Sequence, residues 1–228
     1  MNEDKKALKE FDNWAKKGMA ESMRSGHFPV AKVTMDEIKI NDNFSVLDLS
    51  CGNAWALKYL FKRGIDKGIA TDISFEMLKR AKENLLEYDN RNLVLQSSIT
   101  KLPFKNDKFD VVFNMESFYY YQEPIVVLEE INRVLKKDGI FMLLVDFYKE
   151  NKVSMKWKDR LNIFMNPLST DDYKKLLEKT GFQVEYIKRI ISPNIRERRD
   201  FSPSESIQTY EEYLEFKYSG TLYLLARK

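Results

Sequence analysis

Cysteine and histidine are nearly absent from this chain, because its 228 residues include only Cys51 and His27. A single cysteine excludes an internal disulfide and a cysteine-based metal cluster, and a single histidine excludes a multi-histidine metal site. An excess of one charge is also lacking, since 38 basic and 35 acidic residues leave a formal net charge of +3. No strong overall field therefore draws the protein to nucleic acid or to an anionic membrane.

Long hydrophobic runs are missing as well. The longest, residues 140–145, has the length of a strand and is too short to span a bilayer. The first ten residues, MNEDKKALKE, have no apolar core of the signal-peptide kind. We therefore expect a cytoplasmic protein with no membrane contact. A hydrophobic fraction of 43% is enough for the buried core of one globular domain.

From Ser45 onward, short apolar runs alternate with longer amphipathic segments. This alternation is typical of an α/β protein whose mostly parallel sheet is covered by helices on both faces. The expected strands are residues 45–50, 68–73, 93–98, 109–115, 139–147, 182–190 and 220–228. The expected helices are residues 54–63, 74–88, 123–137 and 169–181. The last of these has Ser169 and Thr170 as its N-cap signal and Gly181 just beyond its C-terminus.

Two regions interrupt the alternation. Residues 1–40 look helical and precede the first strand, and residues 191–219 carry the prolines and polar clusters of an irregular insertion. Both are long enough to act as lids over a site at the strand ends. We predict one domain over residues 1–228, with residues 44–190 and 220–228 as its core.

A cofactor loop is the first interpretation of SVLDLSCGNAW, residues 45–55, since ligands of open α/β sheets bind beyond the carboxyl ends of the strands. A dinucleotide-binding fingerprint would place its three glycines at Ser50, Gly52 and Trp55, and a tryptophan there blocks close helix–strand packing. NAD and FAD are therefore disfavoured. Asp72 ends the second strand, where it either accepts both hydroxyls of a ribose or caps the helix near Ser74.

Read instead as D-x-G-x-G-x-G, residues 48–54 resemble the class I S-adenosylmethionine-dependent methyltransferases. Four further stretches follow in the order and spacing of that family, at residues 70–85, 102–120, 127–147 and 169–189. The resemblance covers about residues 44–190. It implies a Rossmann-like three-layer sandwich with a seven-stranded, mostly parallel sheet whose last strand is antiparallel. It also implies S-adenosylmethionine as the cofactor and methyl transfer as the reaction.

The resemblance assigns cofactor contacts to four strand ends. Residues 48–54 would cradle the methionine and ribose, Asp72 would bind the ribose, and the residues near 98 would border the adenine. Trp14, on the N-terminal helix, either packs on the cofactor or belongs to the core. The predicted cofactor-binding residues are Asp48, Ser50, Cys51, Gly52, Asn53, Ala54, Asp72, Ile73, Ser98, Ile99, Asn114, Met115 and Trp14. No metal site is predicted.

Three positions of the cofactor site depart from the family pattern, and Lys137-Asp138 replaces the family's usual Pro-Gly at a surface turn. Ser50 and Ala54 replace two glycines, and Ser98 stands where many members have an aspartate that accepts from the adenine amino group. These changes leave open a protein that binds S-adenosylmethionine or S-adenosylhomocysteine without catalysis.

Methyl transfer requires a base only when the acceptor must lose a proton. The predicted catalytic residues are Glu116, Tyr120 and His27, and Tyr119, Asp146 and Tyr148 also lie near strand ends. NMES follows the fourth strand in place of NPPY or DPPY, which counts against the amino-methylating nucleic-acid enzymes. We therefore predict a small-molecule acceptor, with a tRNA or rRNA methyltransferase as the alternative. The arginines at 196, 198 and 199 are interpreted as a solvated face. The sequence predicts no oligomeric state.

Overall fold

The computed structural model describes residues 3–41, 43–204 and 207–228. Residues 1–2 of the predicted N-terminal lid and residues 205–206 of the predicted insertion lie outside this part. The strands are β1 (Ser45–Leu49), β2 (Lys67–Asp72), β3 (Asn92–Gln96), β4 (Phe109–Met115), β5 (Leu135–Val145), β6 (Gln183–Ile190) and β7 (Thr221–Arg227). The α-helices are α1 (Glu3–Lys16), α2 (Met19–Asp36), α3 (Trp55–Lys62), α4 (Phe75–Asn84), α5 (Pro124–Val134), α6 (Lys152–Met155), α7 (Thr170–Lys179) and α8 (Tyr210–Ser219).

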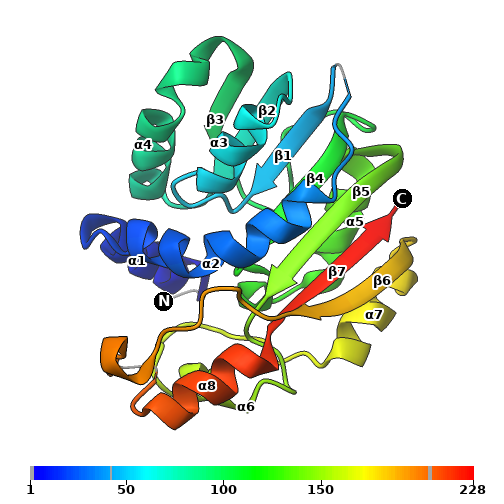
Figure 1. Cartoon of the computed structure of the whole chain (residues 1–228). Coiled ribbons are helices and arrows are strands. Elements are labelled where there is room, and N and C mark those ends of the chain that lie inside the picture. Colours follow the sequence, from blue (N-terminus) through cyan, green and yellow to red (C-terminus); the bar gives the residue numbers. More distant parts are fainter. Residues whose placement is uncertain (1–2, 42, 205–206) are drawn as a thin grey trace.

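All seven strands form one sheet in the order β3-β2-β1-β4-β5-β7-β6 (Figure 1). The pairs from β3 to β5 are parallel, and β7 runs antiparallel to both of its neighbours. The predicted fold class is therefore confirmed, including the antiparallel last strand. From β1 the strand order runs to β2 and β3 on one side and to β4 and β5 on the other. The boundary between β1 and β4 is therefore the topological switch point, where α/β proteins bind ligands.

Alternate residues of each central strand belong to two different cores. On β5, Phe141 and Leu143 pack in the core that contains residues of α5 and α7. Met142 and Leu144 pack in the core that contains residues of α2, α3 and α4. This period of two follows from the pleat, and both faces are apolar because helices cover both. The result is the predicted three-layer sandwich.

The ends of the α-helices were predicted with unequal success. Ser169 caps α7 in a capping box with Asp172, and Gly181 has a φ of 87°, as expected. The helix expected over residues 123–137 instead ends at Val134, because Leu135 already pairs with Phe109 of β4. Pairing with the neighbouring strand overrides the helical pattern there.

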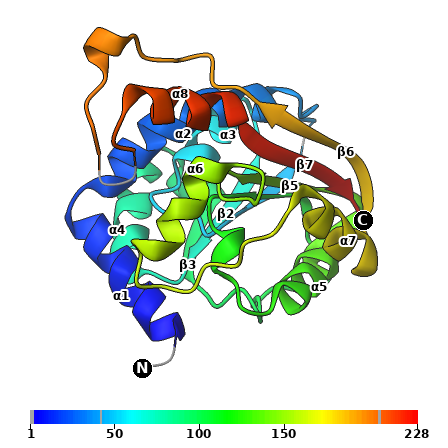
Figure 2. The same ribbon diagram turned by 90° about the horizontal axis from the view of Figure 1, so that it is seen from below.

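Helices α1, α2, α6 and α8 gather at the carboxyl ends of the parallel strands (Figures 1 and 2). Seen from that side, they lie in front of the sheet edge (Figure 2). The site at the strand ends is therefore surrounded by helices that come from both ends of the sequence.

Among the described residues, no helix is both long enough and apolar enough to cross a membrane.

Gly68 on β2 lets α3 pack directly on the sheet. A Cβ at this position would lie 2.4 Å from Leu57 Cδ1 and 3.0 Å from Phe61 Cζ, both on buried side chains. We expect Gly68→Ala to lower the free energy of unfolding by about 1–3 kcal/mol, the usual cost of overpacking. Urea unfolding measures the change.

Gly26→Ala is the matched control, because nothing lies within 4 Å of a Cβ there and Gly26 sits inside α2. Alanine should stabilise this helix by about 0.5–1 kcal/mol. An unchanged stability of Gly68→Ala would contradict the packing argument.

Candidate functional site

A cavity of about 690 Å³ opens beyond the carboxyl ends of β1, β2 and β4. Its floor is formed by the loops that follow these strands, and α1 and α2 contribute Phe11, Trp14, Met23 and His27. The volume lies within the ~300–1,000 Å³ of pockets that bury a drug-sized ligand. None of the described residues between 191 and 219 lines it, so a second lid there stays a prediction.

The loop after β1 keeps a left-handed backbone without its full set of glycines. Ser50, Gly52 and Ala54 have φ values of 56°, 53° and 57°. For the two residues with a Cβ, this conformation costs on the order of 1–2 kcal/mol each. The Ser50 hydroxyl hydrogen-bonds the Tyr121 hydroxyl at 2.7 Å, and the Cys51 N–H donates to the Thr71 carbonyl at 2.9 Å. These contacts hold the loop in a glycine-like shape.

Asp72 joins the first loop to the start of α4. Its Oδ2 accepts from the Gly52 N–H and its Oδ1 from the Ser74 N–H, both at 2.9 Å. Burial raises the pKa of Asp72, and the hydrogen bonds from the Ser74 and Gly52 backbone oppose this rise. The carboxylate also lines the cavity. The two roles weighed from the sequence, a turn partner and a ligand-facing acceptor, are thus compatible.

Asp48 is the most deeply placed acidic group of the loop, with 3% of its surface exposed. Its Oδ2 accepts from the Leu57 N–H at 3.2 Å, near the start of α3. Burial raises the pKa of Asp48 to about 8, and the charge of Asp72 acts in the same direction. A buried carboxyl without a cationic partner is more stable in its neutral form.

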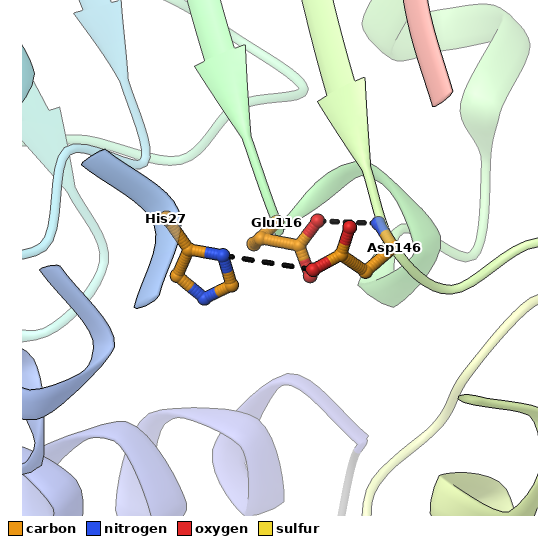
Figure 3. Close-up of side chains that lie close together, drawn as sticks. All are labelled: His27, Glu116 and Asp146. Carbon is orange, nitrogen blue, oxygen red and sulfur yellow. Dashed lines mark hydrogen bonds and ion pairs between the residues drawn. The ribbon is translucent and has the colours of Figure 1, made fainter. Parts of the chain in front are cut away.

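A second polar group lies where β4 and β5 end (Figure 3). Glu116 accepts from the Asp146 N–H at 2.5 Å and from the Tyr119 hydroxyl at 2.9 Å. His27 of α2 reaches the same place, with Nδ1 3.7 Å from Asp146 Oδ2. Burial and then the charge of Asp146 raise the pKa of Glu116 well above its usual range.

Ligand atoms of His27, Glu116 and Asp146 all lie within 4.8 Å of one another, a spacing that a metal ion would also require. Both Glu116 oxygens accept hydrogen bonds, and Asp146 Oδ1 accepts from the Thr221 hydroxyl at 2.6 Å. Hydrogen bonds from donors of the protein therefore already hold Glu116 and Asp146 in place.

Almost all of the predicted site residues come together at the cavity. Those lining it are Trp14, His27, Asp48, Ser50, Cys51, Gly52, Asn53, Asp72, Ile73, Ser98, Ile99, Met115, Glu116 and Tyr120. Ala54 and Asn114 do not line it. Ala54 is fully buried at the start of α3. Asn114 is fully buried too, and its Nδ2 donates to the Leu49 carbonyl at 2.9 Å.

Several lining residues were not among the predicted site residues, notably Phe11, Ser117 and Tyr121. Tyr121 closes the loop network, because its hydroxyl bonds both Ser50 and Ser117. The aromatic run SFYYYQ, residues 117–122, was a signal for this wall of the site. A short turn over residues 118–120 decides which rings face the cavity, and its conformation is not readable from residue types.

A family model described as a methyltransferase domain matches residues 47–143. A solved structure of the Haloferax volcanii complex between the methyltransferase activator Trm112 and a methyltransferase is similar to this chain. It has a TM-score of 0.87 and 31% sequence identity, and the match covers 96% of this chain and 97% of that one.

Two curated proteins are also similar. An uncharacterised protein of Methanocaldococcus jannaschii, MJ1252, is 30% identical over 154 residues, which are 68% of this chain and 56% of that protein. A tRNA U34 carboxymethyltransferase of Photobacterium profundum is 28% identical over 179 residues, which are 73% of this chain and 53% of that protein. The chain therefore spans about half the length of these two relatives.

Proposed function

Because this chain belongs to the class I S-adenosylmethionine-dependent methyltransferases, we propose that it methylates a nucleoside of tRNA. S-adenosylmethionine is its methyl donor, and the predicted enzyme class and cofactor are confirmed. The identity of the acceptor is the new element of the proposal. A cytoplasmic location stays a prediction.

The main support for a tRNA acceptor is the similarity to a tRNA U34 carboxymethyltransferase over 73% of this chain. The cavity is compatible with that class of acceptor. Phe11 and Tyr120 meet edge-to-face with 5.2 Å between their ring centroids, and both line the cavity together with Glu116 and His27. Enzymes that modify a base extrude it from its stack, hold it against aromatic rings and read its polar edge.

One observation favours the small-molecule acceptor predicted from the sequence. Residues 3–38, which include both helices over the cavity, carry seven basic and seven acidic residues. A protein that binds RNA by itself normally offers a basic patch. We reconcile this balance with a tRNA acceptor by proposing that a second protein takes part, as in the similar complex with the activator Trm112.

The lining residues fit S-adenosylmethionine. Asn53 Oδ1 is buried without a hydrogen-bond partner among the described residues, and the space beside Gly52 is open. We propose that Asp72 accepts from the ribose hydroxyls, that Asp48 and residues 50–53 hold the methionine part, and that Ile73 and Ile99 contact the adenine. When bound, the cofactor supplies an electrophilic methyl group on a sulfonium.

The test uses S-adenosylmethionine with a tritiated methyl group, pooled unmodified tRNA transcripts, total tRNA, and a pool of small metabolites. Each acceptor pool is incubated with the chain alone and with an activator of the Trm112 kind. We expect ribonuclease-sensitive label in tRNA, and more of it with the activator. Label confined to the metabolite pool would replace the tRNA proposal by the small-molecule acceptor. Asp72→Ala gives the background.

A further inference from the structure

We infer that His27 is the proton acceptor of the methyl-transfer reaction and that Asp146 positions it. The acceptor atom is then an oxygen or nitrogen that carries its proton until the methyl group arrives. This inference rests on the proposed function for its reaction. It also assigns a role to Asp146, which the sequence analysis places near a strand end without a defined part in the reaction.

His27 stands between the cavity and a buried carboxylate. His27 lines the cavity, whereas Asp146 does not, and His27 Nδ1 lies 3.7 Å from Asp146 Oδ2. Figure 3 shows the imidazole turned so that this nitrogen faces Asp146 and Nε2 is directed away from it. A carboxylate at Nδ1 fixes the tautomer and leaves Nε2 free to accept a proton. Such contacts are often long before the substrate binds.

Asp146 is held rigidly enough to orient a neighbour. Its Oδ1 accepts from the Thr221 hydroxyl at 2.6 Å, and its backbone carbonyl accepts from the Asn151 side chain at 3.0 Å. Its backbone N–H donates to Glu116. These bonds fix the residue between the ends of β5 and β7, and they leave Oδ2 toward His27.

Titratable groups reach His27 from three elements. Asp146 faces it from the end of β5, Glu116 from the end of β4, and Lys217 from α8. Burial lowers the pKa of His27 below its ordinary 6.5; Asp146 raises it, and Lys217 lowers it further. The ring is therefore neutral at neutral pH and can accept a proton.

The other candidate bases hold their protons. Burial and the charge of Asp146 raise the pKa of Glu116 well above its usual range. Burial likewise raises the pKa values of Tyr119 and Tyr120. Glu116 and Tyr120, which line the cavity, are thus suited to donating hydrogen bonds to an acceptor molecule, whereas the Tyr119 hydroxyl already donates to Glu116. Among the predicted catalytic residues, His27 is the one in the form that a base requires.

The acceptor atom gives its proton to His27 Nε2, and its electron pair forms the bond to the methyl carbon. The bond between that carbon and sulfur breaks with its electron pair left on sulfur, which yields S-adenosylhomocysteine. The charge of Asp146 stabilises the imidazolium, which returns the proton to solvent once the product leaves. A positioned base of this kind contributes about 10²–10⁴-fold to the rate.

The first test measures His27 directly, because the chain has only one histidine. The protein with ¹⁵N-labelled histidine is titrated by NMR in the presence of S-adenosylhomocysteine. We expect a pKa below 6.5, a proton on Nδ1 in the neutral form, and a still lower pKa in Asp146→Asn. A proton on Nε2, or the same pKa in both proteins, would overturn the inference. No methyl acceptor is needed, so this result does not depend on tRNA.

The second test compares variants in the tritium assay with tRNA. We expect His27→Gln to lower kcat by about 10²–10⁴-fold, with S-adenosylhomocysteine affinity kept within about twofold. Ser25→Ala, an exposed change on α2, controls for the helix. The acid limb of the wild-type pH profile should fall at the NMR pKa and move lower in Asp146→Asn. A larger decrease in kcat for Glu116→Gln than for His27→Gln would mean that Glu116, and not His27, accepts the proton. No transfer to tRNA by the wild type would reject the acceptor, while the NMR result still decides on His27.

Discussion

Asp72→Ala should weaken the binding of S-adenosylhomocysteine by about 10²–10³-fold. The carboxylate already accepts from the Gly52 and Ser74 N–H groups, and each of its oxygens has a further lone pair for a ribose hydroxyl. A hydrogen bond to a charged group contributes about 1.5–3 kcal/mol, and 1.4 kcal/mol is a tenfold change in affinity. Alanine also removes the contact that holds the first loop against β2.

Isothermal titration calorimetry measures this effect, and thermal unfolding of the same samples shows whether the variant is folded. Asp72→Asn separates charge from hydrogen bonding, because an amide oxygen still accepts but without the negative charge. Asp89→Ala is the matched control, since it removes one negative charge at an exposed position of the short helix Leu86–Arg91 that does not line the cavity. An Asp72→Ala affinity within threefold of the wild type would reject the ribose role.

Most of the fold follows from patterns that the sequence displays locally. Short apolar runs and the amphipathic segments between them place the strands and most of the helices. The cofactor loop is predictable for a related reason: parallel strands bring their carboxyl ends to one edge, so Asp48 and Asp72 must lie near each other. The helix that stops at Val134 shows where local patterns fail, since the strand pairing of Leu135 decides its end.

The acceptor end of the site depends on packing between distant segments. His27 meets Asp146 only because α2 lies at the strand ends, and no residue spacing encodes that approach. The loop offers a second case. Ser50 and Ala54 look like lost glycines, yet the backbone keeps its left-handed turns. The hydroxyl of Tyr121, which bonds Ser50, is a partner that only the folded chain reveals.

Asp48→Asn should raise the free energy of unfolding at high pH and change it much less at low pH. The pKa of Asp48 is raised from 3.8 to about 8 in the folded state, chiefly by burial. The folded protein therefore favours the protonated carboxyl. That contribution is fully present below the unfolded pKa near 4, and it is lost as the pH rises through 8. Asparagine is neutral at every pH and still offers an oxygen to the Leu57 N–H.

Urea unfolding at a series of pH values measures both the direction and the size of this pH-dependent difference in stability. Each pH unit between the two pKa values costs the wild type about 1.4 kcal/mol, so its stability relative to Asp48→Asn should fall by about 2–3 kcal/mol from pH 5 to pH 7. Asp110→Asn should behave oppositely. Burial raises the pKa of Asp110, but hydrogen bonds from Ser45 and Lys136 lower it overall. Its stabilising effect should thus disappear only as the pH falls below about 4. A stability difference between the wild type and Asp48→Asn that does not change with pH would mean that Asp48 is ionised in the folded protein. A contact other than its hydrogen bond from the Leu57 N–H would then stabilise the charge.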